Sequence, residues 1–357
     1  MSADPPALPP LPPLPPSQPL PHLQALHAAG TDPSTEPSPG QTQTQGQTQS
    51  QTQSPGPRRP SAPPPCHLAV CHLTTYHYDR PVEVAHHSAW LRPRDTENQQ
   101  VLGWTLQIDP QPDDPVQQSQ DAFGNWRHGF SHARVHDRLT VTSRFQVRLQ
   151  HSPQPDPLLS PPWQQAVQAL RYRAGVSQPD AVEFMLPSHF APADPRLAAY
   201  ARGAFADGRT LLQAAQALMS HIHRQMVFKP RATDVATDAL QALAQGEGVC
   251  QDFAHLMIGA MRSLGLAARY VSGYLLTQPP PGQPRLVGAD ASHAWVQVWC
   301  PFYGWVALDP TNDVWVGQDH VTLAWGRDYA DVAPLRGVIR GGGNAPPVVG
   351  VTVEPLP

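Results

Sequence analysis

The stretch that decides the fold lies at residues 246–264 and reads GEGVCQDFAHLMIGAMRSL. Its apolar residues recur at the spacing of a helix face, and Gly265 directly after it is a common helix stop. Cys250 stands where the glycine-containing loop enters this helix, and the unpaired N–H groups of a helix N-terminus stabilise a thiolate. The sequence therefore predicts a nucleophilic cysteine, against the plainer alternative of a small buried core cysteine. The apolar face consists of Phe253, Ala254, Met257, Ile258, Met261 and Leu264.

Strand-like segments follow this helix at residues 268–276, 293–300 and 305–308, and residues 348–353 alternate again between apolar and other side chains. One helix followed by antiparallel strands is typical of the α+β class. The segment 301–304 predicts a hairpin between the second and third strands. We therefore expect an α+β fold in which the helix after Cys250 packs on an antiparallel sheet.

The pairing of the two hairpin strands decides whether a histidine and an aspartate meet. His293 opens one strand and Asp309 closes the next. In the simplest four-residue hairpin, Asp309 would point away from His293. A pairing shifted by one residue, with Trp299 opposite Trp305, places Asp309 opposite Trp295, which shares a face with His293. We therefore expect a five-residue loop or a bulge, and a surface on which an imidazole acts as base beside the thiol while a carboxylate orients it.

Four blocks of sequence, in family order, resemble the bacterial transglutaminase-like superfamily. They are GVCQDFAH (248–255), RYVSGY (269–274), DASHAW (290–295) and DPTN (309–312). The resemblance covers roughly residues 210–353, and residues 72–149 resemble the β-type domain that often precedes this core in bacterial members. It implies a papain-like α+β core and a Cys–His–Asp triad, with Cys250 as nucleophile, His293 as base and Asp309 as the residue that orients the base.

The family's chemistry is acyl transfer through a thiol, and the resemblance implies a protein or peptide substrate. The acceptor is either an amine, which gives cross-linking, or water, which gives deamidation or peptide hydrolysis. A cysteine peptidase or amidase with the same triad is one alternative, and a thioester-dependent acyltransferase for small amines is another. A non-enzymatic interaction module is the alternative from a different class, since proteins with this core sometimes lose the nucleophile. Oligomeric state and substrate identity stay open.

Composition separates the start of the chain from the rest. Residues 1–65 hold 19 of the 45 prolines and the tract QTQTQGQTQSQTQS at 41–54, and they contain no aromatic residue. Such a segment buries too little apolar area to fold, so we expect disorder there. Prolines interrupt every candidate apolar stretch of a signal peptide, and the chain has no run of about 18 apolar residues, so we expect no membrane segment and a cytoplasmic location. A formal charge of −4 argues against nucleic acid as a partner.

The remaining sequence suggests three folded regions. Residues 66–150 are expected to form a small β domain, because residues 139–149 alternate strictly in the period-2 pattern of a half-buried strand. Residues 151–209 are expected to form a helical linker region and residues 210–357 the catalytic domain. Helices are predicted over 163–173, 195–206, 210–226 and 234–245, the last of them starting from Asp234 or Thr237.

Other residues that could carry chemistry are assigned structural roles. A metal site among the histidines of the β domain is conceivable, but no pair has the spacing of a zinc site, so we expect solvated or core-rim histidines, no metal and no cofactor. His255 is expected in the core and Asp290 at a turn, although Asp290 could compete with Asp309. One oxyanion donor is expected from the backbone of Cys250, and the second stays open. The β-domain candidates are His67, Cys71, His72, His86 and His87; Cys300, Trp295, Trp299 and Trp305 are expected to pack the sheet or wall the cleft, and Gln225 and His223 are weak oxyanion candidates.

Overall fold

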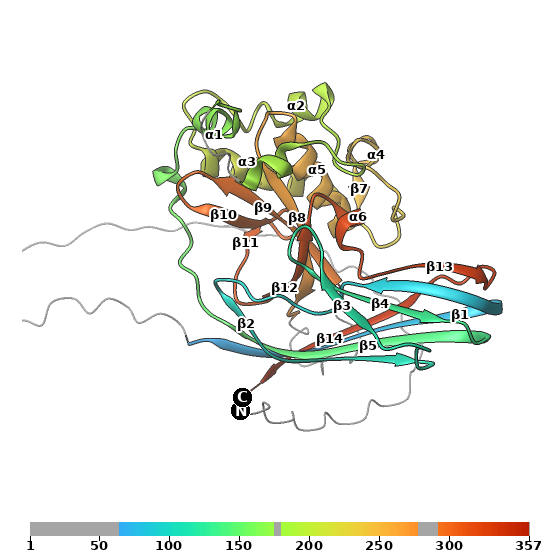
Figure 1. Ribbon diagram of the computed structural model, residues 1–357. Coiled ribbons are helices and arrows are strands. Elements are labelled where there is room, and N and C mark those ends of the chain that lie inside the picture. The colour runs from blue at the N-terminus through green and yellow to red at the C-terminus, as the bar shows by residue number, and fades with distance from the viewer. Residues whose placement is uncertain (1–63, 175–179, 278–291, 357) are drawn as a thin grey trace, which may run out of the picture. The chain divides into compact units, whose positions relative to one another are not determined.

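The structure is a computed structural model that describes residues 64–174, 180–277 and 292–356, all of which fall within one compact unit (Figure 1). The predicted α+β class is confirmed: helices pack on an antiparallel sheet, and a β region precedes them. The proline- and glutamine-rich tail up to residue 63 and Asp290 lie outside the described residues. Within the described ranges, every helix is too short or too polar to cross a membrane.

A long first strand organises the N-terminal sheet. β1 pairs along one side with β5, and the order through the sheet is β2-β5-β1-β4-β3. The predicted strand at 139–149 is confirmed within β5, because its alternate side chains from Leu139 to Leu149 are at most 4% exposed. The strands are β1 (Cys66–Ala89), β2 (Gln99–Asp109), β3 (Gln117–Gln120), β4 (Trp126–His132) and β5 (His136–Leu149).

The last two strands of the chain return to this same sheet. β13 (Leu335–Gly341) pairs with the second half of β1, and β14 (Val348–Leu356) pairs with its first half, as Figure 1 shows. The predicted strand at 348–353 is confirmed as part of β14. Residues 335–356 therefore belong to the same sheet as β1. The division into domains at 66–150, 151–209 and 210–357 stays a prediction.

Several helices precede the loop that leads to Cys250. α3 begins after Thr210, whose hydroxyl accepts from the backbone of Gln213 while the Gln213 side chain caps the backbone of Thr210. α4 starts later than predicted, because Asp238 accepts from the backbone N–H groups of Leu240 and Gln241, whereas Asp234 only closes the preceding turn. The elements are η1 (Pro157–Leu159), α1 (Trp163–Leu170), η2 (Asp180–Met185), α2 (Pro195–Ala201), α3 (Leu211–Gln225) and α4 (Ala239–Gln245).

The second sheet has the order β11-β10-β9-β8-β12, and the central helix α5 (Cys250–Arg262) packs against β8 and β9. Every residue of α5 after Cys250 is buried, so the helix is enclosed by the sheet and the shorter helices. β10 pairs with β9 so that Trp305 lies opposite Trp299, which confirms the shifted register. The expected five-residue loop or bulge is wrong, because Gly304 also pairs with Cys300 and leaves a loop of three residues. The remaining elements are β8 (Ala268–Leu275), β9 (Ser292–Cys300), β10 (Gly304–Asp309), β11 (Val314–Trp315), β12 (His320–Gly326), α6 (Tyr329–Val332) and the short parallel pair β6 (Val227–Phe228) and β7 (Glu247–Gly248).

Candidate active site

The loop before Cys250 is shaped by two glycines with different functions. Gly246 ends α4 in the left-handed conformation, with φ at 68°, which disfavours residues with a side chain. Gly248 lies in β7, and a Cβ there would collide with the carboxylate of Asp252. Cys250 is then the first residue of α5 and is partly exposed. The thiol thus stands at a helix N-terminus, as the sequence predicts.

Asp252 fixes this helix start, and sequence reasoning did not identify it. Its Oδ2 accepts a 2.7 Å bond from the backbone N–H of Val249 and a 2.6 Å bond from the Thr233 hydroxyl. Burial is the main cause that raises the pKa of the Asp252 carboxyl above its ordinary value. A carboxylate three residues after the cap is a known helix-start signal, so the spacing could have revealed it.

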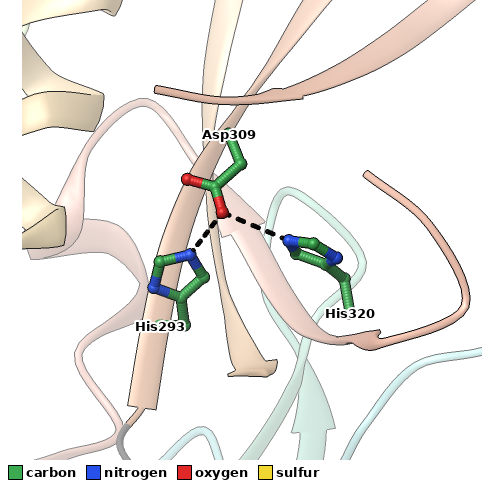
Figure 2. A group of neighbouring side chains, drawn as sticks. All are labelled: His293, Asp309 and His320. Carbon is green, nitrogen blue, oxygen red and sulfur yellow. Dashed lines mark hydrogen bonds and ion pairs between the residues drawn. The ribbon is translucent and has the colours of Figure 1, made fainter. Parts of the chain in front are cut away.

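His293 and Asp309 meet as the shifted register requires. His293 Nε2 lies 2.7 Å from Asp309 Oδ2 (Figure 2), and neither side chain is more than 9% exposed. The two residues come from the start of β9 and the end of β10. Because the hydrogen bond uses Nε2, the other ring nitrogen of His293 is left for Cys250.

The Asp309 carboxylate is saturated with hydrogen-bond donors. Oδ1 accepts from the backbone N–H groups of Thr311 and Asn312, at 2.9 and 3.3 Å. Oδ2 accepts from the Asn312 amide at 2.7 Å and faces His293 and a second histidine, His320, whose Nε2 lies 3.2 Å away. Burial alone would raise the pKa of Asp309, but the hydrogen bonds with His293 and His320 outweigh it and hold that pKa below its ordinary value. Asp309 is therefore an anion.

His293 favours its charged form. Burial alone would lower the pKa of His293, yet hydrogen bonds to Asp309 and to the Cys250 thiol, with the charges of both groups, raise it to about 10. An imidazolium between a sulfur and a carboxylate is the arrangement of a cysteine nucleophile with an oriented base. Chemically, the site can hold a thiolate and return a proton to a leaving group.

His320 was not identified from the sequence, because the strand that carries it was not predicted. Among the described residues, His293, Asp309 and His320 are the only group whose ligand atoms lie close enough, within 4.8 Å of one another, to share a metal ion. The hydrogen bonds of the two imidazoles to one carboxylate oxygen account for this grouping without an ion. The expectation that the protein needs no metal stays a prediction.

The other candidates on and near α5 have structural partners. His255 is fully buried and accepts a 3.1 Å hydrogen bond from the backbone N–H of Tyr329, which confirms a core role. His223 lies 2.9 Å from the carbonyl oxygen of Thr311, so it holds the loop after Asp309. Cys300 is buried in the core, as expected. Trp295 is also buried, and its ring packs edge-on against that of His320.

The histidines of the β region face different surroundings. His72 is buried, with its ring nitrogens 2.9 Å from the Thr74 hydroxyl and 3.0 Å from that of Tyr274. His67 accepts from Arg148, and His87 stacks on Phe130. None of these histidines belongs to a group of described residues that could share an ion.

Comparisons with known proteins show what this chain is similar to. The sequence pattern of the transglutaminase-like superfamily matches residues 198–310, and that of the bacterial transglutaminase-like N-terminal region matches residues 68–148. An uncharacterized protein of Mycobacterium tuberculosis is 39% identical over 274 residues, which are 76% of this chain and 86% of that protein. A protein-glutamine gamma-glutamyltransferase of Pseudomonas aeruginosa is 35% identical over 132 residues, 36% of this chain and 20% of that protein. The solved structure of a candidate cysteine protease from Cytophaga hutchinsonii has a TM-score of 0.65 at 20% identity, covering 83% of this chain and 92% of that one, which shows a shared fold.

Proposed function

The chain belongs to the transglutaminase-like superfamily, and from that premise we propose that it is an enzyme that transfers acyl groups from protein or peptide amides through Cys250. The observation that carries the proposal is the His293 imidazole, which lies 2.7 Å from the Asp309 carboxylate and whose pKa is raised by that carboxylate and by the Cys250 thiol. Such a constellation is needed for a thiolate nucleophile at neutral pH.

In the proposed reaction, the Cys250 sulfur attacks the carbonyl carbon of a carboxamide. The carbon–nitrogen bond breaks, His293 gives its proton to the leaving nitrogen, and a thioester to Cys250 forms. An amine or a water molecule then attacks the thioester, His293 takes the proton from the attacking atom, and the thiolate leaves. Asp309 keeps the imidazole in the orientation that both proton transfers need.

The start of α5 supports an oxyanion donor in this reaction. The backbone N–H groups of a first helical turn have no acceptor within the helix. The N–H of Cys250 is therefore available to the carbonyl oxygen as it gains charge. His223 is a poor second donor, because its ring is bonded to the carbonyl of Thr311.

An assay with two acceptors tests the proposal. Wild type and Cys250→Ala would be incubated with a glutamine-rich protein and a fluorescent primary amine, while ammonia release and new peptide termini are followed by mass spectrometry. Incorporation of the amine would identify a transferase, and ammonia release without incorporation a deamidase. New termini would identify a peptidase. If wild type and Cys250→Ala gave the same products across a whole-proteome digest, the enzymatic proposal would fail in favour of an interaction module.

Two further expectations rest on the same proposal. The substrate is a protein or peptide, with no nucleic acid or membrane involved in its recognition. The cytoplasmic location is likewise a proposal, which fractionation of cells that make the protein would test.

A further inference from the structure

A second histidine contacts the same oxygen of the Asp309 carboxylate as His293 does. His320 opens β12 and is 4% exposed. Its Nε2 lies 3.2 Å from Asp309 Oδ2, and its Nδ1 lies 2.6 Å from Oδ1 of Asp319. Figure 2 shows the two imidazoles converging on one carboxylate oxygen.

The hydrogen bonds of His320 define its protonation. Ionised carboxylate oxygens only accept hydrogen bonds, so the ring satisfies both neighbours only when each of its nitrogens carries a hydrogen. The Gly317 backbone N–H also points at Nδ1, but at 3.5 Å it is a much weaker partner than Asp319 at 2.6 Å, so the geometry favours the imidazolium form of His320. Asp319 supplies a negative charge that favours this imidazolium. The desolvation cost is small, because the Asp319 side chain is 52% exposed and stays solvated.

We propose that His320 is a positioning residue, which fixes the Asp309 carboxylate and moderates how strongly that carboxylate holds the proton on His293. The proposal rests on the proposed function, because it concerns the same triad. Its first effect is orientation: the carboxylate cannot turn without losing the bonds of His320 and Asn312 to Oδ2. Trp295 keeps His320 in place, with its ring 5.3 Å away at 83°.

The second effect is electrostatic. The ring centres of His293 and His320 lie 6.0 Å apart. A unit positive charge at that distance, at an effective dielectric constant of about 20, changes the proton affinity of the other ring by on the order of two pH units. His320 thus offsets part of the pull of Asp309. A general acid must release its proton to the leaving group, so too high an affinity would slow turnover.

The charged groups that face His320 come from several places in the chain. Asp309 lies at the end of β10 and His293 at the start of β9, while Asp319 is adjacent in sequence. Cys66 of β1 lies near Asp319, and burial together with that carboxylate raises the pKa of the Cys66 thiol. The thiol is therefore neutral, and His320 is balanced by two carboxylates.

Two substitutions separate the hydrogen bond from the charge. Asp319→Asn lets His320 become neutral while its Nε2–H still donates to Asp309. His320→Gln puts a neutral amide donor in the same place and leaves the Asp319 charge. His72→Gln is the matched control, because His72 is equally buried but bonds to Thr74 and Tyr274.

The readout is the protonation of His293, measured by NMR of labelled imidazole between pH 6 and 12. With a pKa of about 10, wild-type His293 is half protonated at pH 10. His320→Gln is expected to raise the pH of half-protonation by about 1–2 units, so that more than about nine-tenths of the ring is protonated at pH 10. Asp319→Asn is expected to give a smaller rise, because it also removes a negative charge, and His72→Gln none.

An unchanged or lowered midpoint in both His320→Gln and Asp319→Asn would overturn the proposal, even if stability falls. If His320→Gln does not fold, Asp319→Asn still tests the proposal, since Asp319 is half exposed and its replacement disturbs the core little. The titration needs no turnover. A failure of the acyl-transfer assay and a failure of the His320 proposal are therefore separate results.

Discussion

Replacing Asp309 with asparagine is expected to reverse the hydrogen-bond polarity of the site. Oδ1 of Asp309 accepts two backbone N–H groups, so the amide oxygen of the substituted side chain would take that place. The amide NH₂ would then face the Nε2 atoms of His293 and His320. To accept from it, His293 must carry its hydrogen on Nδ1, the nitrogen left for Cys250. An imidazole in that tautomer cannot take a proton from the thiol.

The size of the loss follows from the His293 environment. A pKa raised from 6.5 to about 10 corresponds to about 5 kcal/mol of preference for the imidazolium, and Asp309 is one of its two sources. Without the imidazolium, the thiol loses the positive charge that would favour its ionised, nucleophilic form. Alkylation of Cys250 at pH 7 is thus expected to fall by on the order of tenfold or more. Turnover is expected to fall about 10⁴-fold, the size found for this substitution in a serine protease triad.

The assay follows iodoacetamide labelling of the Cys250 peptide by mass spectrometry across pH 5–10, with melting temperature measured in parallel. Asp313→Asn is the matched control, because Asp313 lies in the same loop but accepts a 2.6 Å bond from Ser220 instead of His293. The control is expected to label like wild type. Labelling of Asp309→Asn at the wild-type rate, with an unchanged pH profile, would refute the orienting role of Asp309.

Three further outcomes are expected. Cys250→Ala is expected to lower activity by about 10⁴-fold or more at an unchanged melting temperature, and retained turnover would exclude Cys250 as nucleophile. Burial lowers the pKa of His72 and His87 to about 4, so both imidazoles are neutral in the folded protein. The contribution of each histidine to the free energy of unfolding is therefore complete above pH 6.5, and it declines by up to about 3 kcal/mol as the pH falls to 4. Denaturant unfolding at pH 7.5 and 4.5 would measure this loss. Gly273→Ala is expected to cost about 1–3 kcal/mol, because a Cβ there would strike the neighbouring strand and a tryptophan ring, whereas Gly203→Ala, with open space around it, should leave the melting temperature within error.

The sequence predicts the parts of the site that depend on local pattern. The helix that starts at Cys250 follows from apolar spacing, and the contact between His293 and Asp309 follows from a hairpin register. Both rest on periodicities of the backbone, 3.6 residues for a helix and two for a strand, and these act within one or two elements. The start of α4 could not be predicted from these periodicities, since Asp234, Thr237 and Asp238 can all cap a helix and only Asp238 does.

The pairing of strands that lie far apart in the chain could not be predicted, for a different reason. The strand at 348–353 was predictable from alternation, but its partner is β1, more than 270 residues earlier in the chain. β13 escaped prediction, because glycines surround it and most of its side chains are exposed. An antiparallel edge strand needs no apolar face once the adjacent strand supplies the hydrogen bonds. Sheet membership of the C-terminal segment is therefore a property of the whole fold.

His320 shows what a three-residue motif omits. A thiolate, an imidazolium and a carboxylate together carry one net negative charge, and an unbalanced charge in a buried site is costly. In this protein two imidazoles share the buried Asp309 carboxylate, so in the proposed reaction a His320 imidazolium offsets the negative charge that a Cys250 thiolate would add. The fifth group, Asp319, has its charge in contact with water. The site is thus a chain of alternating charges that reaches solvent at a carboxylate, and its electrostatic balance depends on a histidine outside the three motif residues.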